Sequence, residues 1–136
     1  MKAWILPALT ALGLWGLWGF LPKIATRYID PKSALVLQAI GSMLVGFGVL
    51  ITLRDHFQWQ ATGAFWAILT GVFGMLGSLF FLRAVSRGKI SAVVTVTALY
   101  PLISIILALI FLKEPFGLKQ GLGVLCALTA LILFST

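Results

Sequence analysis

Long apolar stretches alternate with short charged spacers along the whole chain. Four of the stretches carry no charged side chain, and a fifth has only Lys119 near its start. A helix rises about 1.5 Å per residue, so each stretch can span a hydrocarbon core of about 30 Å, the last one only just. Backbone groups find no hydrogen-bond partner in lipid, which favours helices over an open sheet. The pattern predicts an all-α polytopic membrane protein with five transmembrane helices, at about 3–22, 33–53, 61–82, 90–112 and 117–135.

The stretch 90–112 combines strong apolar character with a row of polar side chains. Thr97, Tyr100 and Ser104 are spaced by three and four residues, which places them on one face of a helix. Pro101 beside them leaves a carbonyl one turn upstream without its usual donor, and in lipid that carbonyl needs a partner. We interpret 90–112 as the helix around which the others pack, and its polar face as a candidate substrate-binding surface.

A simpler interpretation of this polar face is also open. The hydroxyls of Thr and Ser can donate back to carbonyls of their own helix, or join neighbouring helices, without any ligand. The phenol of Tyr100 is harder to explain in this way, because a hydroxyl deep in an apolar environment usually requires a partner.

The stretch 3–22 adds two aromatic side chains, Trp15 and Trp18, in its second half. One interpretation is anchoring at the lipid headgroups, where tryptophan is enriched. The other is an aromatic wall along a substrate cavity, where the indole face would hold a ring or a cation. Both residues are therefore candidates for substrate binding.

Glycine recurs every three residues in two of the stretches, 3–22 and 61–82. Such rows allow two helix backbones to approach closely, and membrane helices depend on this because lipid supplies no hydrophobic force between them. A phosphate-binding loop does not fit, since no strand precedes the glycines and no Lys-Ser or Lys-Thr follows them. The pattern predicts two helix-packing faces, formed by Gly13, Gly16 and Gly19 and by Gly71, Gly74 and Gly77.

Composition and charge support the membrane assignment. Only 10% of the residues are charged, against about 25% in an average soluble domain, so the chain cannot cover itself with polar surface. The net charge of +7 comes from basic residues in or beside the spacers, with no basic face or arm. We therefore expect contacts with lipid headgroups and no nucleic-acid partner. The first stretch is long for a signal-peptide core and four more follow, so we expect a transmembrane helix there.

The predicted spans contain no Asp, Glu or His, and the three acidic residues lie in spacers or at a helix end. Ionisable residues inside a membrane are typical of proton relays and cation sites. Their absence argues against a proton pump, a drug antiporter with a buried carboxylate, and an intramembrane protease. The single cysteine, Cys126, has no disulfide or metal-ligand partner in the sequence. We therefore expect no enzyme activity, no metal and no cofactor, and a structural role for Glu114 in the turn before the last helix.

Five helices place the two ends of the chain on opposite sides of the membrane. One side carries four basic residues and the other six, namely Lys2, Arg54, Lys113 and Lys119 against Lys23, Arg27, Lys32, Arg83, Arg87 and Lys89. The positive-inside rule thus favours a C-terminal end inside, by a small margin. Two interpretations follow from so weak a bias: a single orientation, or both orientations with antiparallel pairing.

Three short motifs resemble a known family: Ala98-Leu-Tyr-Pro-Leu102, Phe111-Leu-Lys-Glu114 and Gln120-Gly-Leu-Gly123. They are similar to the last two helices of the EamA repeat in the drug/metabolite transporter superfamily, and the resemblance covers nearly the whole chain. It implies transport of small metabolites or amphiphiles across a prokaryotic plasma membrane, through a cavity near the midplane between two repeats. Tyr100-Pro101 matches the family's helix motif, and Glu114 matches its acidic turn residue.

The chain departs from the family pattern in several places. Lys113 stands where a glycine usually precedes the acidic residue. Most members carry two repeats and this chain carries one, so the resemblance implies a homodimer, possible in parallel or antiparallel form, that rebuilds an inverted repeat. The first helix also lacks the membrane-embedded glutamate of the small multidrug relatives, so their mechanism is not transferred.

The resulting hypothesis is a small-solute transporter that works by alternating access as a homodimer, with one domain over residues 1–136. The absence of buried charge favours a neutral, zwitterionic or aromatic solute. One alternative is a non-transporting membrane subunit of a larger complex, and another is a flippase for a lipid-linked metabolite. The predicted solute pathway is lined by Trp15, Trp18, Thr97, Tyr100 and Ser104.

Overall fold

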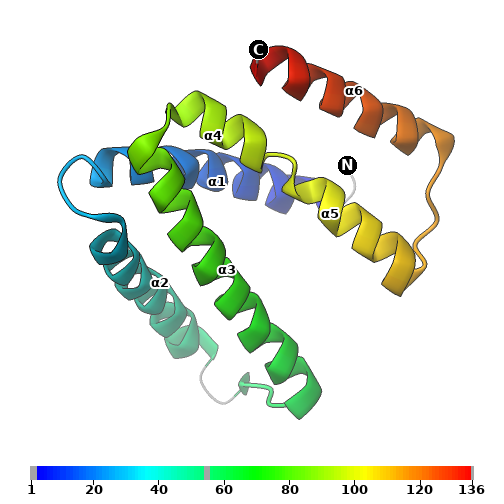
Figure 1. Ribbon diagram of the computed structural model, residues 1–136. Coiled ribbons are helices and arrows are strands. Elements are labelled where there is room, and N and C mark those ends of the chain that lie inside the picture. Colours follow the sequence, from blue (N-terminus) through cyan, green and yellow to red (C-terminus); the bar gives the residue numbers. More distant parts are fainter. Residues whose placement is uncertain (1–2, 54–55, 136) are drawn as a thin grey trace. The chain divides into compact units, whose positions relative to one another are not determined.

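The computed structural model describes residues 3–53 and 56–135, and the regular elements in these ranges are all helical (Figure 1). The chain divides into two compact units, Met1–Arg87 and Gly88–Thr136, which are called here the first and the second unit. The first unit contains α1 (Ile5–Ala25), α2 (Pro31–Leu53) and α3 (Ala61–Arg87). The second unit contains α4 (Ile90–Thr97), α5 (Tyr100–Leu107), the π-helix η2 (Ala108–Leu112) and α6 (Leu118–Ser135).

Most large apolar side chains of these helices are exposed. Leu12 is 69% exposed, Phe47 63% and Phe73 65%, although all three lie well inside their helices. Such a surface is unfavourable in water and suits the hydrocarbon core of a bilayer. Four stretches within the described ranges are apolar and long enough to cross a membrane: α1, α2, α3 and Ile90–Leu112. The apolar part of α6, Leu118–Leu133, is shorter. The prediction of an all-α polytopic membrane protein is confirmed, with the last helix the marginal one.

Two helices extend beyond their predicted ends into the charged spacers. The prediction ended the first helix at Pro22, but α1 continues to Ala25, and both the N–H and the Oγ1 of Thr26 donate to the Pro22 carbonyl at 2.9 Å. The third helix was predicted to end at 82, and α3 continues to Arg87. An apolar stretch marks only the part of a helix that lies in lipid, whereas the helical backbone can continue into the charged spacer.

The predicted single helix over 90–112 is broken between α4 and α5. Ala98 and Leu99 form a turn there, and the Leu102 N–H donates to Leu99 at 3.0 Å instead of to Ala98. Pro101 has no N–H to donate to Thr97, which is the physical reason for the break. As a result, no described donor reaches the carbonyl oxygens of Thr97 or Ala98.

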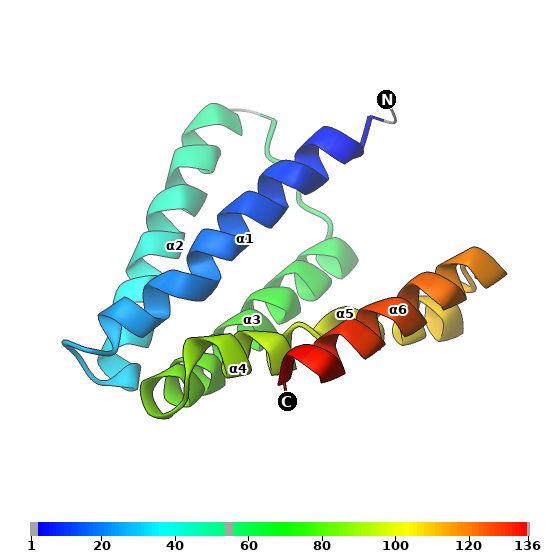
Figure 2. The same cartoon turned by 90° about the horizontal axis from the view of Figure 1, so that it is seen from above.

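The core of the first unit lies on the second half of α3. Ser78, Phe81, Leu82 and Val85 are buried there, whereas α5 has no buried side chain. Figures 1 and 2 show the end of α1, the start of α2 and the end of α3 close together, while the other ends of these three helices spread apart. The expectation that the other helices pack around 90–112 concerns both units together and stays a prediction. The small Ser78 and the β-branched Val85 admit close neighbours, which apolar character alone does not reveal.

Candidate functional site

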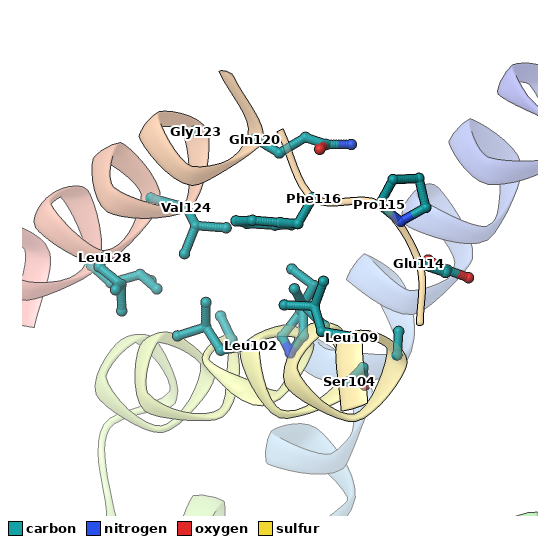
Figure 3. A pocket seen from close by; sticks show the side chains of 16 residues that line it. Leu102, Ser104, Leu109, Glu114, Pro115, Phe116, Gln120, Gly123, Val124 and Leu128 are labelled. Atoms are coloured by element: carbon teal, nitrogen blue, oxygen red, sulfur yellow. The ribbon is translucent and has the colours of Figure 1, made fainter. Parts of the chain in front are cut away.

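A cavity of about 660 Å³ lies within the second unit, between the α5–η2 segment and α6 (Figure 3). Its size falls in the usual range of small-molecule sites, about 300–1,000 Å³. The lining is mostly aliphatic, with a phenylalanine ring and a few polar groups. Its labelled members in Figure 3 are Leu102, Ser104, Leu109, Glu114, Pro115, Phe116, Gln120, Gly123, Val124 and Leu128. We call this cavity the α5–α6 groove.

The ring of Phe116 occupies the middle of the view in Figure 3, between side chains of α5 and α6. Leu102 and Leu109 approach it from one side, and Val124 from the other. The ring also reaches Gly121, where an added Cβ would lie 3.6 Å from its Cε1 atom. Phe116 is therefore the main aromatic surface of the groove, and sequence reasoning missed it. The signal was available in Pro115-Phe-Gly117, a turn sequence that places an aromatic side chain just before a helix.

The turn at the end of the groove is held by backbone geometry. Lys113 adopts a left-handed conformation with φ 51°, and its N–H donates to the Ala108 carbonyl. The side-chain Oε1 of Gln120 accepts a hydrogen bond from the Gly117 N–H at 2.5 Å. Glu114 is exposed, forms no ion pair within the described chain, and points away from the groove in Figure 3. The structural role predicted for its carboxylate stays a prediction.

The three predicted residues of the polar face have different surroundings. Ser104 lines the α5–α6 groove. Thr97 donates from Oγ1 to the Val93 carbonyl at 2.9 Å, which is the bond within its own helix that the simpler interpretation requires. Tyr100 is 56% exposed and is not part of the groove lining. The break at Ala98 and Leu99 separates Thr97 from the other two, so the row does not continue along one uninterrupted helix.

The break itself borders the groove, because Ala98 and Pro101 both line it. Of the two carbonyls that lack donors in the described chain, that of Ala98 belongs to a residue lining the groove, and that of Thr97 belongs to the residue before it. Non-helical backbone inside a membrane is tolerated where it lines a cavity or is buried in protein. The sequence indicated a freed carbonyl near Pro101, and the structure places two there.

The two predicted tryptophans belong to the first unit. The Trp18 ring stacks on Phe81 of α3, with ring centroids 5.3 Å apart and planes inclined by 26°. Trp15 is 63% exposed. Trp18 thus has a packing partner inside its own unit, and a shared pathway between either tryptophan and the groove stays a prediction.

The two glycine rows are open within the first unit. Apart from the glycine's chain neighbours and its own helix backbone, no described atom would lie within 4 Å of a Cβ added at any of the six positions. The contacts among α1, α2 and α3 use other residues, such as the Gln38 Nε2 donor and the Ser78 Oγ acceptor at 3.0 Å. The predicted packing role of Gly13, Gly16, Gly19, Gly71, Gly74 and Gly77 therefore calls for another helix and stays a prediction.

The described residues contain no group of three or more His, Cys, Asp or Glu side chains that could hold a metal ion. Cys126 is an exposed free thiol on α6. The polar groups of the groove lining are the Ser104 hydroxyl, the Glu114 carboxylate and the Gln120 amide, and Ala98 adds a backbone carbonyl without a described donor. A mostly apolar lining with a few polar groups is typical of small-molecule sites.

Comparison with known proteins gives the chain a family. The model of the EamA-like transporter family matches residues 2–136. An uncharacterized transporter of Archaeoglobus fulgidus is 31% identical over 99% of this chain and 48% of its own length. The uncharacterized transporter YvbV of Bacillus subtilis is 33% identical over 97% of this chain and 44% of its own length. An uncharacterized protein of Methanocaldococcus jannaschii is 36% identical over 52% of this chain and 51% of its own length.

No solved structure matches the chain. The chain spans about half the length of the curated relatives that it matches over nearly all of its residues. The family match covers both units and includes all three motifs that resemble the EamA repeat. The chain belongs to the EamA-like transporter family.

Proposed function

We propose that this chain is the five-helix part of a small-solute transporter, and that the α5–α6 groove forms part of the solute pathway. The observation that carries the proposal is the position of the groove beside a broken helix. In many transporters, substrate sites lie where membrane helices are interrupted, because unwound carbonyls can bind polar groups there. Family membership and the transporter names of two relatives support the same function.

The chemistry of the lining suggests the class of solute. Phe116 and the leucines offer an apolar surface, and Ser104 offers a hydroxyl. The open carbonyls of Thr97 and Ala98 are acceptors that a solute's N–H or O–H group can use. Glu114, the groove's charged residue, points away from the other labelled side chains. A small amphiphile with an apolar or aromatic part and an N–H or O–H donor fits this lining. An isolated anion does not, because no Lys or Arg is among the described residues that line the groove.

Alternating access is the mechanism we propose. The break at Ala98 and Leu99 removes backbone hydrogen bonds between α4 and α5, so it provides a place where α5 can tilt. Hinges are commonly a few residues at the ends of such elements. Tilting of α5 would open or close the groove because α5 supplies one of its walls.

A second copy of the chain would complete the transporter. The relatives of Archaeoglobus fulgidus and Bacillus subtilis are about twice as long as this chain, and inverted repeats in such transporters form the substrate site between them. The open glycine rows of α1 and α3 are surfaces on which another helix could pack closely. We propose a homodimer, parallel or antiparallel, in the prokaryotic plasma membrane.

The test is solute flux by the purified chain in liposomes, with a panel of labelled neutral, zwitterionic and aromatic solutes. Ala127 lines the groove, and Leu125 on the same helix is exposed and does not. Ala127→Trp should reduce flux at least tenfold by filling the groove, whereas Leu125→Trp should leave flux within about twofold. Equal effects of the two substitutions would contradict the pathway. A complete lack of flux for the whole panel, with the chain folded, would favour the non-transporting subunit.

A further inference from the structure

A second cavity lies in the first unit, at the end where α1, α2 and α3 come together. Its volume is about 590 Å³, and it is formed by the start of α2 and the last turns of α3. The lining consists of Asp30, Pro31, Lys32, Arg83, Ser86 and Arg87. In contrast to the α5–α6 groove, this cavity is lined almost entirely by polar and charged residues. We call it the basic cavity.

Three cations line the basic cavity, and none of them has an ion-pair partner within the described chain. Lys32, Arg83 and Arg87 are exposed, and the Arg83 guanidinium lies over the ring of Phe80, 5.6 Å from its centroid. Arginine guanidinium groups match the geometry of phosphate oxygens and bind them through two parallel hydrogen bonds. Three unpaired cations around one hollow favour an anionic ligand.

One carboxylate also lines the basic cavity, and its hydrogen bonds are already made. Asp30 accepts from the backbone N–H groups of Lys32 at 2.9 Å and Ser33 at 3.2 Å, and from the Ser33 hydroxyl. These bonds, led by that from the Ser33 side chain, lower the pKa of Asp30. Asp30 therefore caps α2 and forms no ion pair with the three cations. The cavity keeps two positive charges in excess, from three cations against one carboxylate.

The last carbonyls of α3 would repel an anion, but the chain covers some of them. Lys23 Nζ donates to the Val85 carbonyl at 2.6 Å, and Ser86 Oγ donates to the Arg83 carbonyl at 2.8 Å. Donors at these carbonyls reduce the partial negative charge that the helix dipole places near the cavity. The arginines are thus available to a ligand rather than to their own helix end.

The position of the cavity along the helices indicates the source of the anion. Lys32 immediately precedes the apolar stretch of α2, and Arg83 immediately follows that of α3. Both residues therefore stand at the level of the lipid headgroups. Arg83 lies over Phe80, the usual arrangement of a side chain with its stem in the apolar layer and its charge in the headgroup layer. Basic pockets between membrane helices bind phosphorylated headgroups in this way.

We propose that Lys32, Arg83 and Arg87 bind the phosphate group of an anionic phospholipid, which holds the ends of α2 and α3 together. This site is independent of the α5–α6 groove and of the transported solute. Basic residues beside a membrane span also fix topology, and that role needs no cavity. The proposal adds a local, saturable site to the general attraction between the basic spacers and an anionic leaflet.

The experiment compares lipid binding by two matched charge variants of the full chain in nanodiscs. Arg83→Gln/Arg87→Gln removes two charges from the basic cavity. Arg27→Gln/Lys89→Gln removes two charges from the same predicted side of the membrane, at residues that do not line the cavity. Native mass spectrometry then measures how many phosphatidylglycerol and phosphatidylcholine molecules stay bound to each protein.

The unaltered protein should retain phosphatidylglycerol in preference to phosphatidylcholine. Each cavity charge should contribute about fivefold to the ratio of bound phosphatidylglycerol to phosphatidylcholine. This ratio should therefore be lower by roughly tenfold or more in the cavity variant. The control variant should keep it within about threefold. Equal losses in both variants, or no preference in the unaltered protein, would overturn the proposal. Displacement of phosphatidylglycerol by millimolar inorganic phosphate would also overturn it, in favour of a free-phosphate site.

A second measurement does not depend on the variants folding. A phosphatidylglycerol analogue with a photoreactive headgroup is activated in the presence of the unaltered chain, and the adducts are mapped by peptide mass spectrometry. Adducts within 27–33 and 83–89 that excess phosphatidylglycerol suppresses support the site. Adducts spread evenly over all basic spacers would contradict it.

Discussion

Lys23 Nζ lies 2.6 Å from the carbonyl oxygen of Val85, and this hydrogen bond ties the end of α1 to the last turns of α3. Val85 has no exposed surface, so its carbonyl is in a position that water does not easily reach. A buried backbone acceptor that loses its donor costs about 1–3 kcal/mol. The bond therefore gives a basic spacer residue a structural role beyond topology.

The first prediction concerns this bond. Lys23→Met keeps an unbranched apolar stem and removes the donor, so it should lower the free energy of unfolding by about 1–3 kcal/mol. Unfolding by sodium dodecyl sulfate in mixed micelles, followed by circular dichroism, measures the change. Lys119→Met serves as the control, because the Lys119 side chain is exposed and makes no hydrogen bond within the described chain, and it should have little effect. Equal losses from the two substitutions would show that the Val85 contact contributes nothing.

A second prediction concerns the polar pair Gln38 and Ser78. The Gln38 Nε2 atom donates to Ser78 Oγ at 3.0 Å, and Ser78 is buried in the contact between α2 and α3. Interhelical bonds of this kind contribute about 0.6 kcal/mol on average in a membrane protein. A double-mutant cycle with Gln38→Leu and Ser78→Ala should give a coupling energy of about that size. Additive effects of the two substitutions would mean that the bond does not hold α2 to α3.

The sequence predicted the membrane class and the approximate spans because apolar stretches of helical length are hard to explain otherwise. The bond from Gln38 to Ser78 has a simple physical reason, since a polar side chain in lipid needs a partner, but the apolar pattern alone does not identify that partner. The sequence did not predict the groove, because Phe116 lies outside the apolar periodicity that was used to choose candidates. Nor did it predict the break, because one proline inside a membrane helix is compatible with a kink as well as with an interruption.

Lys113 gives a third prediction, which links the family pattern to backbone geometry. A left-handed residue that ends a helix favours glycine, and other residues are strained by about 1 kcal/mol there. Lys113→Gly should therefore raise the free energy of unfolding by roughly 0.5–1 kcal/mol. Ala130→Gly, at an exposed position well inside α6, should lower it by about the same amount, because glycine weakens a helix interior. A destabilised Lys113→Gly protein would contradict the left-handed turn.

Asp30 gives a prediction about pH. Its pKa is lowered in the folded chain by the Ser33 hydroxyl and the N–H groups of Ser33 and Lys32. A lowered folded pKa means that the stabilisation is present above the unfolded value of about 3.9 and is lost as the pH falls through the folded value. Asp30→Asn keeps a capping side chain that does not titrate. As the pH falls from 5 through the folded pKa of Asp30, the free energy of unfolding of this variant should therefore fall less than that of the unaltered protein. Parallel unfolding profiles for the two proteins would remove Asp30 from the acid response.

The last prediction tests whether the broken helix is needed for transport. Pro101→Ala restores an N–H that can donate to the Thr97 carbonyl, so α4 and α5 should join into one helix over most of Ile90–Leu107. Amide hydrogen exchange should then slow at 98–102, and stability should stay equal or rise. If the open carbonyls or a tilt of α5 serve transport, flux should fall at least tenfold in the same protein. Pro7→Ala is the control, because Pro7 lies in the first turn of α1 where no intrahelical donor is missing, and it should leave flux unchanged. Slower exchange with full flux would mean that the break is a local result of the proline, and that the groove works without it.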